Sequence, residues 1–116
     1  MTSVRIYHNP GCSKSRQTLA LLQENGQDPE IVLYLESPPN QAELNQIVTQ
    51  LGSNPRDVIR TGEAAYAEMN LDDESLSNDE LIDAIIKAPI LMQRPIVVAN
   101  NQARIGRPPE KVLEIL

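Results

Sequence analysis

The residue with the clearest chemical potential is Cys12, the only cysteine in the chain. It follows the turn-forming sequence Asn-Pro-Gly at residues 9–11 and precedes a segment with helical periodicity, so we predict that it lies at the start of a helix. The first N–H groups of a helix have no intrahelical partner, and the helix dipole is positive at that end. Both effects favour a thiolate and lower the pKa of a cysteine. The pattern therefore predicts a nucleophilic thiol.

A lone cysteine is more often a small buried apolar residue than a catalyst. The neighbours of Cys12 argue against that alternative, because a turn precedes it and four polar residues follow it, namely Ser13, Lys14, Ser15 and Arg16. Lys14 and Arg16 also add positive charge near the sulfur. Reactive thiols occur in exposed, electropositive settings, so we expect the Cys12 side chain to be accessible.

Three arginines at predicted element boundaries could bind an anion beside this thiol. Arg60 ends a short predicted helix, Arg94 directly precedes the proline that begins a strand, and Arg107 lies between a strand and a helix. For any one of them, a solvated surface position is the simpler explanation. If the three converge on Cys12, their guanidinium groups form a clamp for a tetrahedral oxyanion through bidentate hydrogen bonds. Sequence spacing alone does not show whether the three arginines converge on Cys12.

His8 and Ser15 are candidates for activating the thiol. His8 lies four residues before Cys12, where it either makes a structural hydrogen bond at a strand end or stabilises the thiolate and transfers protons. Ser15 lies one helical turn after Cys12, and its hydroxyl either hydrogen-bonds the sulfur or faces solvent. A cysteine phosphatase is excluded, because its Cys-x5-Arg motif requires arginine at the position that Thr18 occupies.

A mixed α/β fold is predicted for the elements that must position these residues. The first half of the chain predicts a strand over residues 4–7, a helix after the turn, and a strand over residues 30–35 that is buried on both faces. This order forms a βαβ unit. Two capped amphipathic helices are predicted over residues 40–52 and 77–88, with a short helix near residues 54–60 between them.

The last part of the chain predicts a hairpin and a final helix. Strands over residues 95–99 and 102–106 flank Asn100 and Asn101, which tolerate the positive φ of a type I′ turn. A helix opens at residues 107–110. The whole order predicts an α/β sandwich: a mixed four-stranded sheet with a helical insertion between strands 2 and 3, in a single domain over residues 1–116.

Composition narrows the function classes. The formal net charge of −6 argues against sequence-independent nucleic-acid binding, and we interpret the acidic cluster at residues 72–83 as a solvated face. The sequence shows no signal peptide and no run of membrane-spanning length, so we expect no membrane contact. A single cysteine excludes an internal disulfide framework and fits a reducing cytoplasm. With no Cys-x-x-Cys pair and one histidine, the chain offers no ordinary zinc site.

Several segments resemble the glutaredoxin-coupled arsenate reductase family, which has a thioredoxin-like fold. They follow one another through nearly the whole chain: His-Asn-Pro-x-Cys-x-x-Ser-Arg at 8–16, Tyr-Leu-Glu-Ser-Pro-Pro at 34–39, Leu-Ile-Asp at 81–83, Pro-Ile-Leu-Met-Gln-Arg-Pro-Ile-Val-Val at 89–98, Arg-Pro at 107–108 and Val-Leu-Glu-Ile-Leu at 112–116. The resemblance implies a nucleophilic Cys12, oxyanion binding by Arg60, Arg94 and Arg107, and thiolate activation by His8 and Ser15. It also implies a cis bond between Arg94 and Pro95.

The resemblance further implies that the protein reduces arsenate to arsenite. Arsenate docks on the arginines, and the Cys12 thiolate attacks arsenic and expels water. Glutathione then adds to arsenic, and a glutaredoxin thiol drives reduction and arsenite release. A chain with a single cysteine agrees with this scheme, because its electrons must come from external thiols. Glutathione is thus a co-substrate, and no metal or bound organic cofactor is implied.

One motif departs from the best-established arsenate reductases, which read Ala-Cys-Gly-Thr-Ser where this chain reads Gly-Cys-Ser-Lys-Ser. It is similar to a sister branch with the Cys-Ser-Lys-Ser form, and Lys14 either aids arsenate binding or marks another substrate. Two alternatives therefore stay open. One is a glutathione-linked thiol oxidoreductase acting on another oxyanion or a glutathionylated protein. The other is a Spx-like regulator that binds RNA polymerase, although Ser15 occupies the second position of the Cys-x-x-Cys switch that such regulators often carry.

Overall fold

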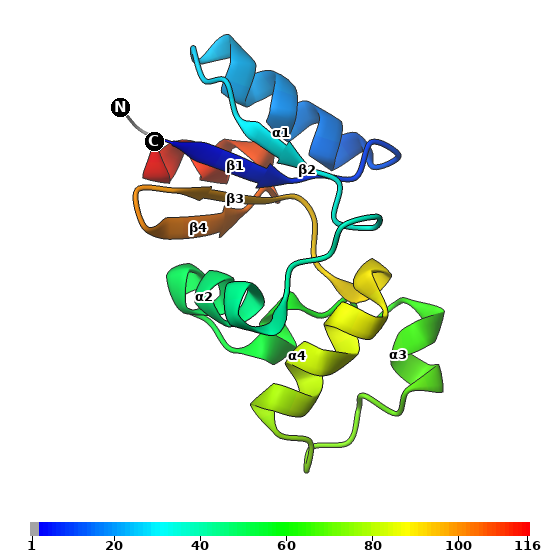
Figure 1. The fold of residues 1–116 in the computed structure, drawn as a ribbon. Coiled ribbons are helices and arrows are strands. Elements are labelled where there is room, and N and C mark those ends of the chain that lie inside the picture. Colours follow the sequence, from blue (N-terminus) through cyan, green and yellow to red (C-terminus); the bar gives the residue numbers. More distant parts are fainter. Residues whose placement is uncertain (1–2) are drawn as a thin grey trace. The chain divides into compact units, whose positions relative to one another are not determined.

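The computed structural model describes residues 3–116, which form two compact units (Figure 1). The first unit combines the two ends of the chain, up to Ser37 and from Arg94 to Leu116, and the second unit is Pro38–Gln93. No helix among the described residues is long and apolar enough to cross a membrane.

The first unit is built on a four-stranded sheet with the order β2-β1-β3-β4. β1 pairs in parallel with β2 and antiparallel with β3, and β3 pairs antiparallel with β4. The predicted mixed sheet is confirmed, and the helical segment of the chain is inserted between its second and third strands. The bounds of the strands are Val4–Tyr7 for β1, Glu30–Val32 for β2, Ile96–Ala99 for β3 and Gln102–Ile105 for β4.

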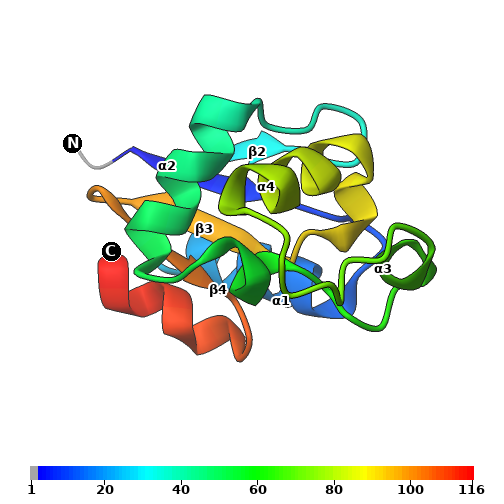
Figure 2. The same cartoon turned by 90° about the horizontal axis from the view of Figure 1, so that it is seen from below.

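The core of the first unit joins this sheet to helix α1 (Ser13–Glu24) and the 3-10 helix η3 (Pro109–Ile115). Val4 and Ile6 of β1 stand opposite Ala99 and Val97 of β3, and antiparallel partners share one face of a sheet. Leu22 of α1, with Val112 and Ile115 of η3, packs on that face. η3 also lies beside β4 (Figure 2). Burial of these apolar side chains holds the two ends of the chain together.

β2 differs from the predicted strand in length and burial. It ends at Val32, and Leu33 opens a turn whose carbonyl accepts the N–H of Ser37 at 2.9 Å. Ile31, Leu33 and Leu35 are exposed, so the prediction of burial on both faces is wrong. The physical reason is twofold: Ile31 lies on an edge strand with a neighbour on one side only, and Leu33 and Leu35 lie in the turn beyond the end of that strand. The apolar composition of residues 30–35 therefore did not predict how deeply their side chains are buried.

The local turn and cap predictions for the first unit are confirmed. Cys12 is the N-cap of α1, and Asn100 and Asn101 have φ of 53° and 61° in the β3–β4 hairpin. The Arg94–Pro95 bond is cis, as the resemblance implied. The Arg107–Pro108 bond is also cis, which nothing in the sequence analysis predicts.

The second unit is helical, and its two long helices begin at the predicted caps. The Asn40 side chain accepts the N–H of Glu43 at 2.8 Å, and Ser77 and Glu80 form a reciprocal capping box with both bonds at 3.1 Å. Helix α4 packs against α2, η1 and η2. The bounds are Gln41–Leu51 for α2, Pro55–Val58 for η1, Ala64–Glu68 for α3, Asn78–Lys87 for α4 and Pro89–Leu91 for η2.

Candidate active site

The loop between β1 and α1 holds Cys12 in a closed turn. The N–H of Cys12 donates to the carbonyl of Asn9 at 3.0 Å, and the N–H of Gly11 donates to Asn9 Oδ1 at 2.9 Å. Arg16 Nη1 reaches back from the first turn of α1 to the carbonyl of Pro10 at 2.7 Å. These bonds leave the sulfur beside the first N–H groups of the helix.

The Cys12 residue is only 9% exposed, so the expectation of an accessible thiol is wrong. Polar neighbours in the sequence did not reveal that distant segments cover the sulfur. Burial raises the pKa of the thiol and is the largest single effect, but it is outweighed by the backbone N–H of Ser15, the guanidinium of Arg94 and the backbone N–H of Lys14. The resulting pKa lies below the usual thiol value, which favours the nucleophilic thiolate.

Two of the three predicted arginines meet Cys12 in the first unit. Arg107 Nη2 lies 3.6 Å from the sulfur, and Arg107 Nε donates to the backbone carbonyl of Arg94 at 2.8 Å. The sheet explains this convergence. Antiparallel pairing places Tyr7 at the end of β1 opposite Ile96 at the start of β3. Arg94, two residues before Ile96, therefore lies near the start of the loop between β1 and α1 that carries Cys12. β4 pairs antiparallel with β3, so Arg107, which follows β4, lies at the same end of the sheet as Arg94.

Arg60 belongs to the second unit. Its backbone N–H donates to the carbonyl of Leu91 at 2.7 Å, and its Nε forms an ion pair with Glu63 at 3.2 Å. Its role as the third oxyanion-binding arginine therefore stays a prediction.

His8 and Ser15 form a buried hydrogen bond of 2.6 Å between Nδ1 and Oγ. Ser15 Oγ also accepts the N–H of Asn9 at 3.0 Å. Burial lowers the pKa of His8, and the positive charge of Arg16 lowers it further, so both favour the neutral ring. Because the backbone N–H of Ser15 stabilises the Cys12 thiolate, Ser15 links His8 to the sulfur. The structure thus brings both predicted activating residues into the network of the thiol.

The sequence analysis did not single out Gly106 and gave Thr18 no role at the site. A Cβ on Gly106 would lie 2.5 Å from Thr18 Oγ1 and 2.8 Å from Pro95 Cγ, well inside contact distance. Thr18 is fully buried on α1, the helix that begins at Cys12. Gly106 therefore permits the close approach that seats Arg107 beside the thiol. The available signal was a glycine directly before a candidate anion-binding arginine.

Among residues 3–116, no three His, Cys, Asp or Glu side chains gather into a potential metal site. The arrangement around Cys12 offers a stabilised thiolate with guanidinium donors beside it. Such a site can attack an electrophilic centre that carries negative oxygen atoms.

Comparisons with known proteins agree with this fold. A family model described as "ArsC family" matches residues 7–115. "Uncharacterized protein YfgD" of Escherichia coli (strain K12) is 59% identical over 114 residues, which cover 97% of this chain and 96% of that protein. An "Arsenate reductase" of Haemophilus influenzae is 50% identical over 115 residues, covering 98% and 99% of the two chains.

The backbone of this chain is also similar to those of solved structures. "Arsenate reductase from Vibrio cholerae" has a TM-score of 0.97 and 54% identity, and the match covers 99% of this chain and 98% of that one. "Putative arsenate reductase from Yersinia pestis" has a TM-score of 0.93 and 54% identity, covering 97% and 100% of the two chains. The predicted thioredoxin-like α/β fold is confirmed.

Proposed function

The chain belongs to the ArsC family, and we propose that it is an arsenate reductase in which Cys12 is the nucleophile. The observation that carries the proposal is the Cys12 sulfur at the N-terminus of α1, with Arg107 Nη2 3.6 Å away and a pKa lowered by Ser15, Arg94 and Lys14. Further support comes from relatives named arsenate reductase at 44% and 50% identity.

The first step is nucleophilic attack on arsenic. Arsenate binds to Arg94 and Arg107, and Arg60 completes the clamp if it acts as the resemblance implies. The Cys12 thiolate forms an S–As bond, and one arsenate oxygen leaves as water after taking up protons. Guanidinium groups favour this step, because they neutralise the negative oxygen atoms that would repel a thiolate. His8 and Ser15 hold the catalytic loop and keep the thiolate in place.

The electrons come from two external thiols. Glutathione adds to arsenic and displaces a second water. A glutaredoxin thiolate then attacks the glutathione sulfur and forms a glutaredoxin–glutathione disulfide. The bond between arsenic and the glutathione sulfur breaks, and its electron pair stays on arsenic, which becomes arsenic(III). Hydrolysis of the remaining S–As bond releases arsenite and restores the Cys12 thiolate. The chain has no second cysteine to form an internal disulfide, which favours external donors.

This scheme needs glutathione as a co-substrate and no bound cofactor, and it operates in a reducing compartment such as the cytoplasm. The prediction of a single domain over residues 1–116 also stays a proposal.

The decisive experiment couples arsenate reduction to NADPH oxidation through glutathione, glutaredoxin and glutathione reductase. Wild type should consume NADPH only when arsenate is present, and Cys12→Ser should not. Ser13→Ala, a neighbouring change that leaves the sulfur in place, should remain active. A folded wild-type protein with an alkylatable Cys12 but no arsenate-dependent turnover would contradict the proposal, and would favour another oxyanion as substrate.

Further experiments test whether glutaredoxin is required and which arginines bind the oxyanion. Omitting glutaredoxin should stop multiple turnovers, and turnover sustained by glutathione alone would remove glutaredoxin from the scheme. Arg94→Lys should weaken binding of arsenate and of its analogue sulfate, because an ammonium cannot reproduce the planar fork of a guanidinium. Arg60→Lys should do the same, and an unchanged affinity in that variant would exclude Arg60 from the oxyanion site.

A further inference from the structure

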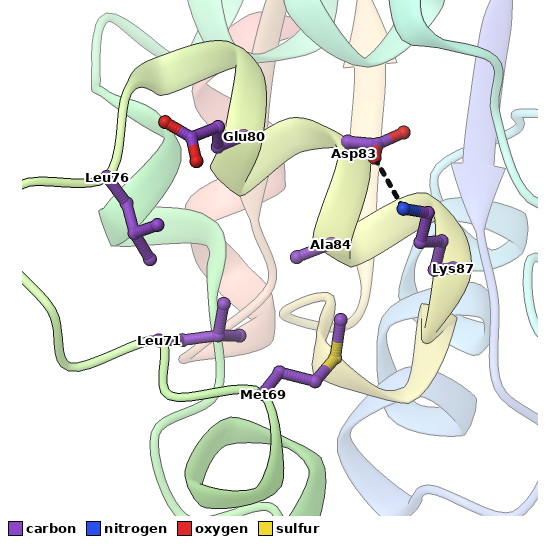
Figure 3. A pocket seen from close by; sticks show the side chains of 7 residues that line it. All are labelled: Met69, Leu71, Leu76, Glu80, Asp83, Ala84 and Lys87. Carbon is purple, nitrogen blue, oxygen red and sulfur yellow. Dashed lines mark ion pairs between the residues drawn. The ribbon is translucent and has the colours of Figure 1, made fainter.

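A pocket in the second unit takes no part in the proposed reaction. It has a volume of about 220 Å³ and lies between the segment that follows α3 and helix α4 (Figure 3). Met69, Leu71 and Leu76 line it from the segment, and Ala84 lines it from the helix. Leu71 and Ala84 are buried, whereas Met69 and Leu76 are partly exposed. The pocket therefore has an apolar lining that is open to solvent.

The segment that forms one wall is held in place by hydrogen bonds within the second unit. Arg56 Nη1 donates to the carbonyl of Leu71 at 2.8 Å, and Arg56 Nη2 donates to the carbonyl of Asp73 at 2.5 Å. Asp73 Oδ1 accepts the N–H and the hydroxyl of Ser75 at 2.9 Å and 2.7 Å. A wall fixed in this way is preformed, so a ligand need not order it.

The two elements that form the pocket are rich in carboxylates. Glu80, Asp83 and Lys87 line the pocket directly, and the charges of Asp83 and Lys87 offset each other in an exposed ion pair of 2.9 Å. The guanidinium of Arg56 is engaged by backbone carbonyls of the same segment. The same segment and helix carry six exposed carboxylates: Asp72, Asp73, Glu74, Asp79, Glu80 and Asp83. An apolar hollow between two predominantly acidic elements is complementary to a ligand that is apolar at its centre and positive at its edges.

We propose that this pocket binds a basic segment of a partner protein, with one apolar side chain of that segment inserted among Met69, Leu71, Leu76 and Ala84. The lysines and arginines of the segment lie over the surrounding carboxylates. A volume of about 220 Å³ is below the usual range of about 300–1,000 Å³ for small-molecule sites, which favours a single anchoring side chain. A second copy of this chain is disfavoured, because a two-fold interface would bring the predominantly acidic elements of the two copies together. Nucleic acids and anionic membranes are repelled by the same charge.

The probes that test this inference are three labelled pentapeptides used with the full-length protein. Lys-Arg-Leu-Arg-Lys should bind with a dissociation constant below about 1 mM at low salt. Lys-Arg-Ser-Arg-Lys has the same charge without the apolar side chain and should bind about tenfold more weakly. Glu-Glu-Leu-Glu-Glu should not bind. Amide chemical shifts in the protein should change at Met69, Leu71 and Ala84, and binding of the basic leucine peptide should weaken as salt increases.

Variants of the protein separate the hollow from the charge. Ala84→Leu fills the pocket and should weaken binding of the leucine peptide about tenfold, with no effect on the serine peptide. Met69→Ala tests the same lining if Ala84→Leu folds poorly. The double variant Glu80→Gln/Asp83→Asn should weaken both basic peptides. Its matched control, Glu24→Gln/Asp28→Asn, makes the same changes at exposed positions of the first unit and should bind as wild type does.

Equal affinity for the leucine and serine peptides would overturn the proposal, since charge alone would then explain binding. It is also overturned if the shifts fall outside the pocket, if Ala84→Leu and Met69→Ala leave binding unchanged, or if the acidic peptide binds as well. Self-association that broadens the pocket resonances would assign the surface to a second copy instead. Arsenate reduction by Ala84→Leu should match wild type, so failure of this inference is independent of the proposed reaction.

Discussion

Replacing Arg107 with lysine tests whether the shape of the guanidinium, rather than its charge, serves the thiol. Arg107 donates through Nε to the carbonyl of Arg94 at 2.8 Å, and its Nη2 lies 3.6 Å from the Cys12 sulfur. A lysine has one nitrogen at the end of a flexible chain and cannot occupy both positions. Arg107→Lys therefore keeps the charge and loses either the bond that orients the side chain or the contact with the reacting atoms.

The expected loss follows from the strength of one such contact. A hydrogen bond to a charged group contributes about 1.5–3 kcal/mol, and each 1.36 kcal/mol of barrier changes a rate by a factor of about ten. If the lost bond is one that strengthens as charge develops on arsenate, kcat/KM falls about 10- to 150-fold. Arg107 is exposed, so this change should leave the free energy of unfolding within about 0.5 kcal/mol of wild type.

Arg104→Lys is the matched control. Arg104 lies on β4, three residues before Arg107, and its Nε pairs with Glu114 at 2.9 Å on the surface. Exposed pairs of this kind contribute about 0–1 kcal/mol, so the control should keep kcat/KM within about twofold of wild type in the coupled NADPH assay. Equal losses in the two variants, or less than a twofold loss in Arg107→Lys, would refute the reasoning from guanidinium geometry.

Three further predictions follow from the described contacts. The pH midpoint for alkylation of Cys12 by iodoacetamide should lie below that of free cysteine, and Arg94→Gln should raise it, because Arg94 stabilises the thiolate; an unchanged midpoint would remove Arg94 from the thiol's environment. Gly106→Ala should lower the free energy of unfolding in urea by about 1–3 kcal/mol, whereas Gly62→Ala, with nothing near its Cβ, should have a small effect; similar losses in the two variants would argue against steric crowding. The folded state holds His8 neutral, so unfolded chains bind more protons, and stability present above about pH 6.5 is lost as the pH falls through the lowered pKa of the folded state. His8→Gln should flatten that slope in denaturation curves measured across pH, and identical slopes would contradict the assignment.

Local features of the chain could be predicted because a few contiguous residues contain the physical cause. Asn40 and Ser77 cap helices through bonds to N–H groups three residues away, and Asn100 and Asn101 tolerate positive φ, so these features needed no tertiary information. The position of Cys12 at the N-terminus of α1 belongs to the same class.

The apolar run at residues 30–35 shows where such reasoning stopped. Its composition favours a strand, but its burial depends on how many strands flank it. Ile31 lies on the edge strand β2, and Leu33 and Leu35 lie in the turn beyond its end, so all three remain exposed although they are as apolar as residues of a central strand.

By itself, the sequence determined which residues could do chemistry and where the helix caps and the hairpin turn lie. Cys12, His8, Ser15 and three arginines were identifiable from residue type and position alone. Only the tertiary structure decided that Arg94 and Arg107 reach Cys12, that the thiol is largely buried, and that Gly106 must lack a side chain. The physical reason is that strand pairing between β1 and β3 joins residues more than 80 positions apart in the chain. The conformational preferences of neighbouring residues cannot predict a contact between segments so far apart.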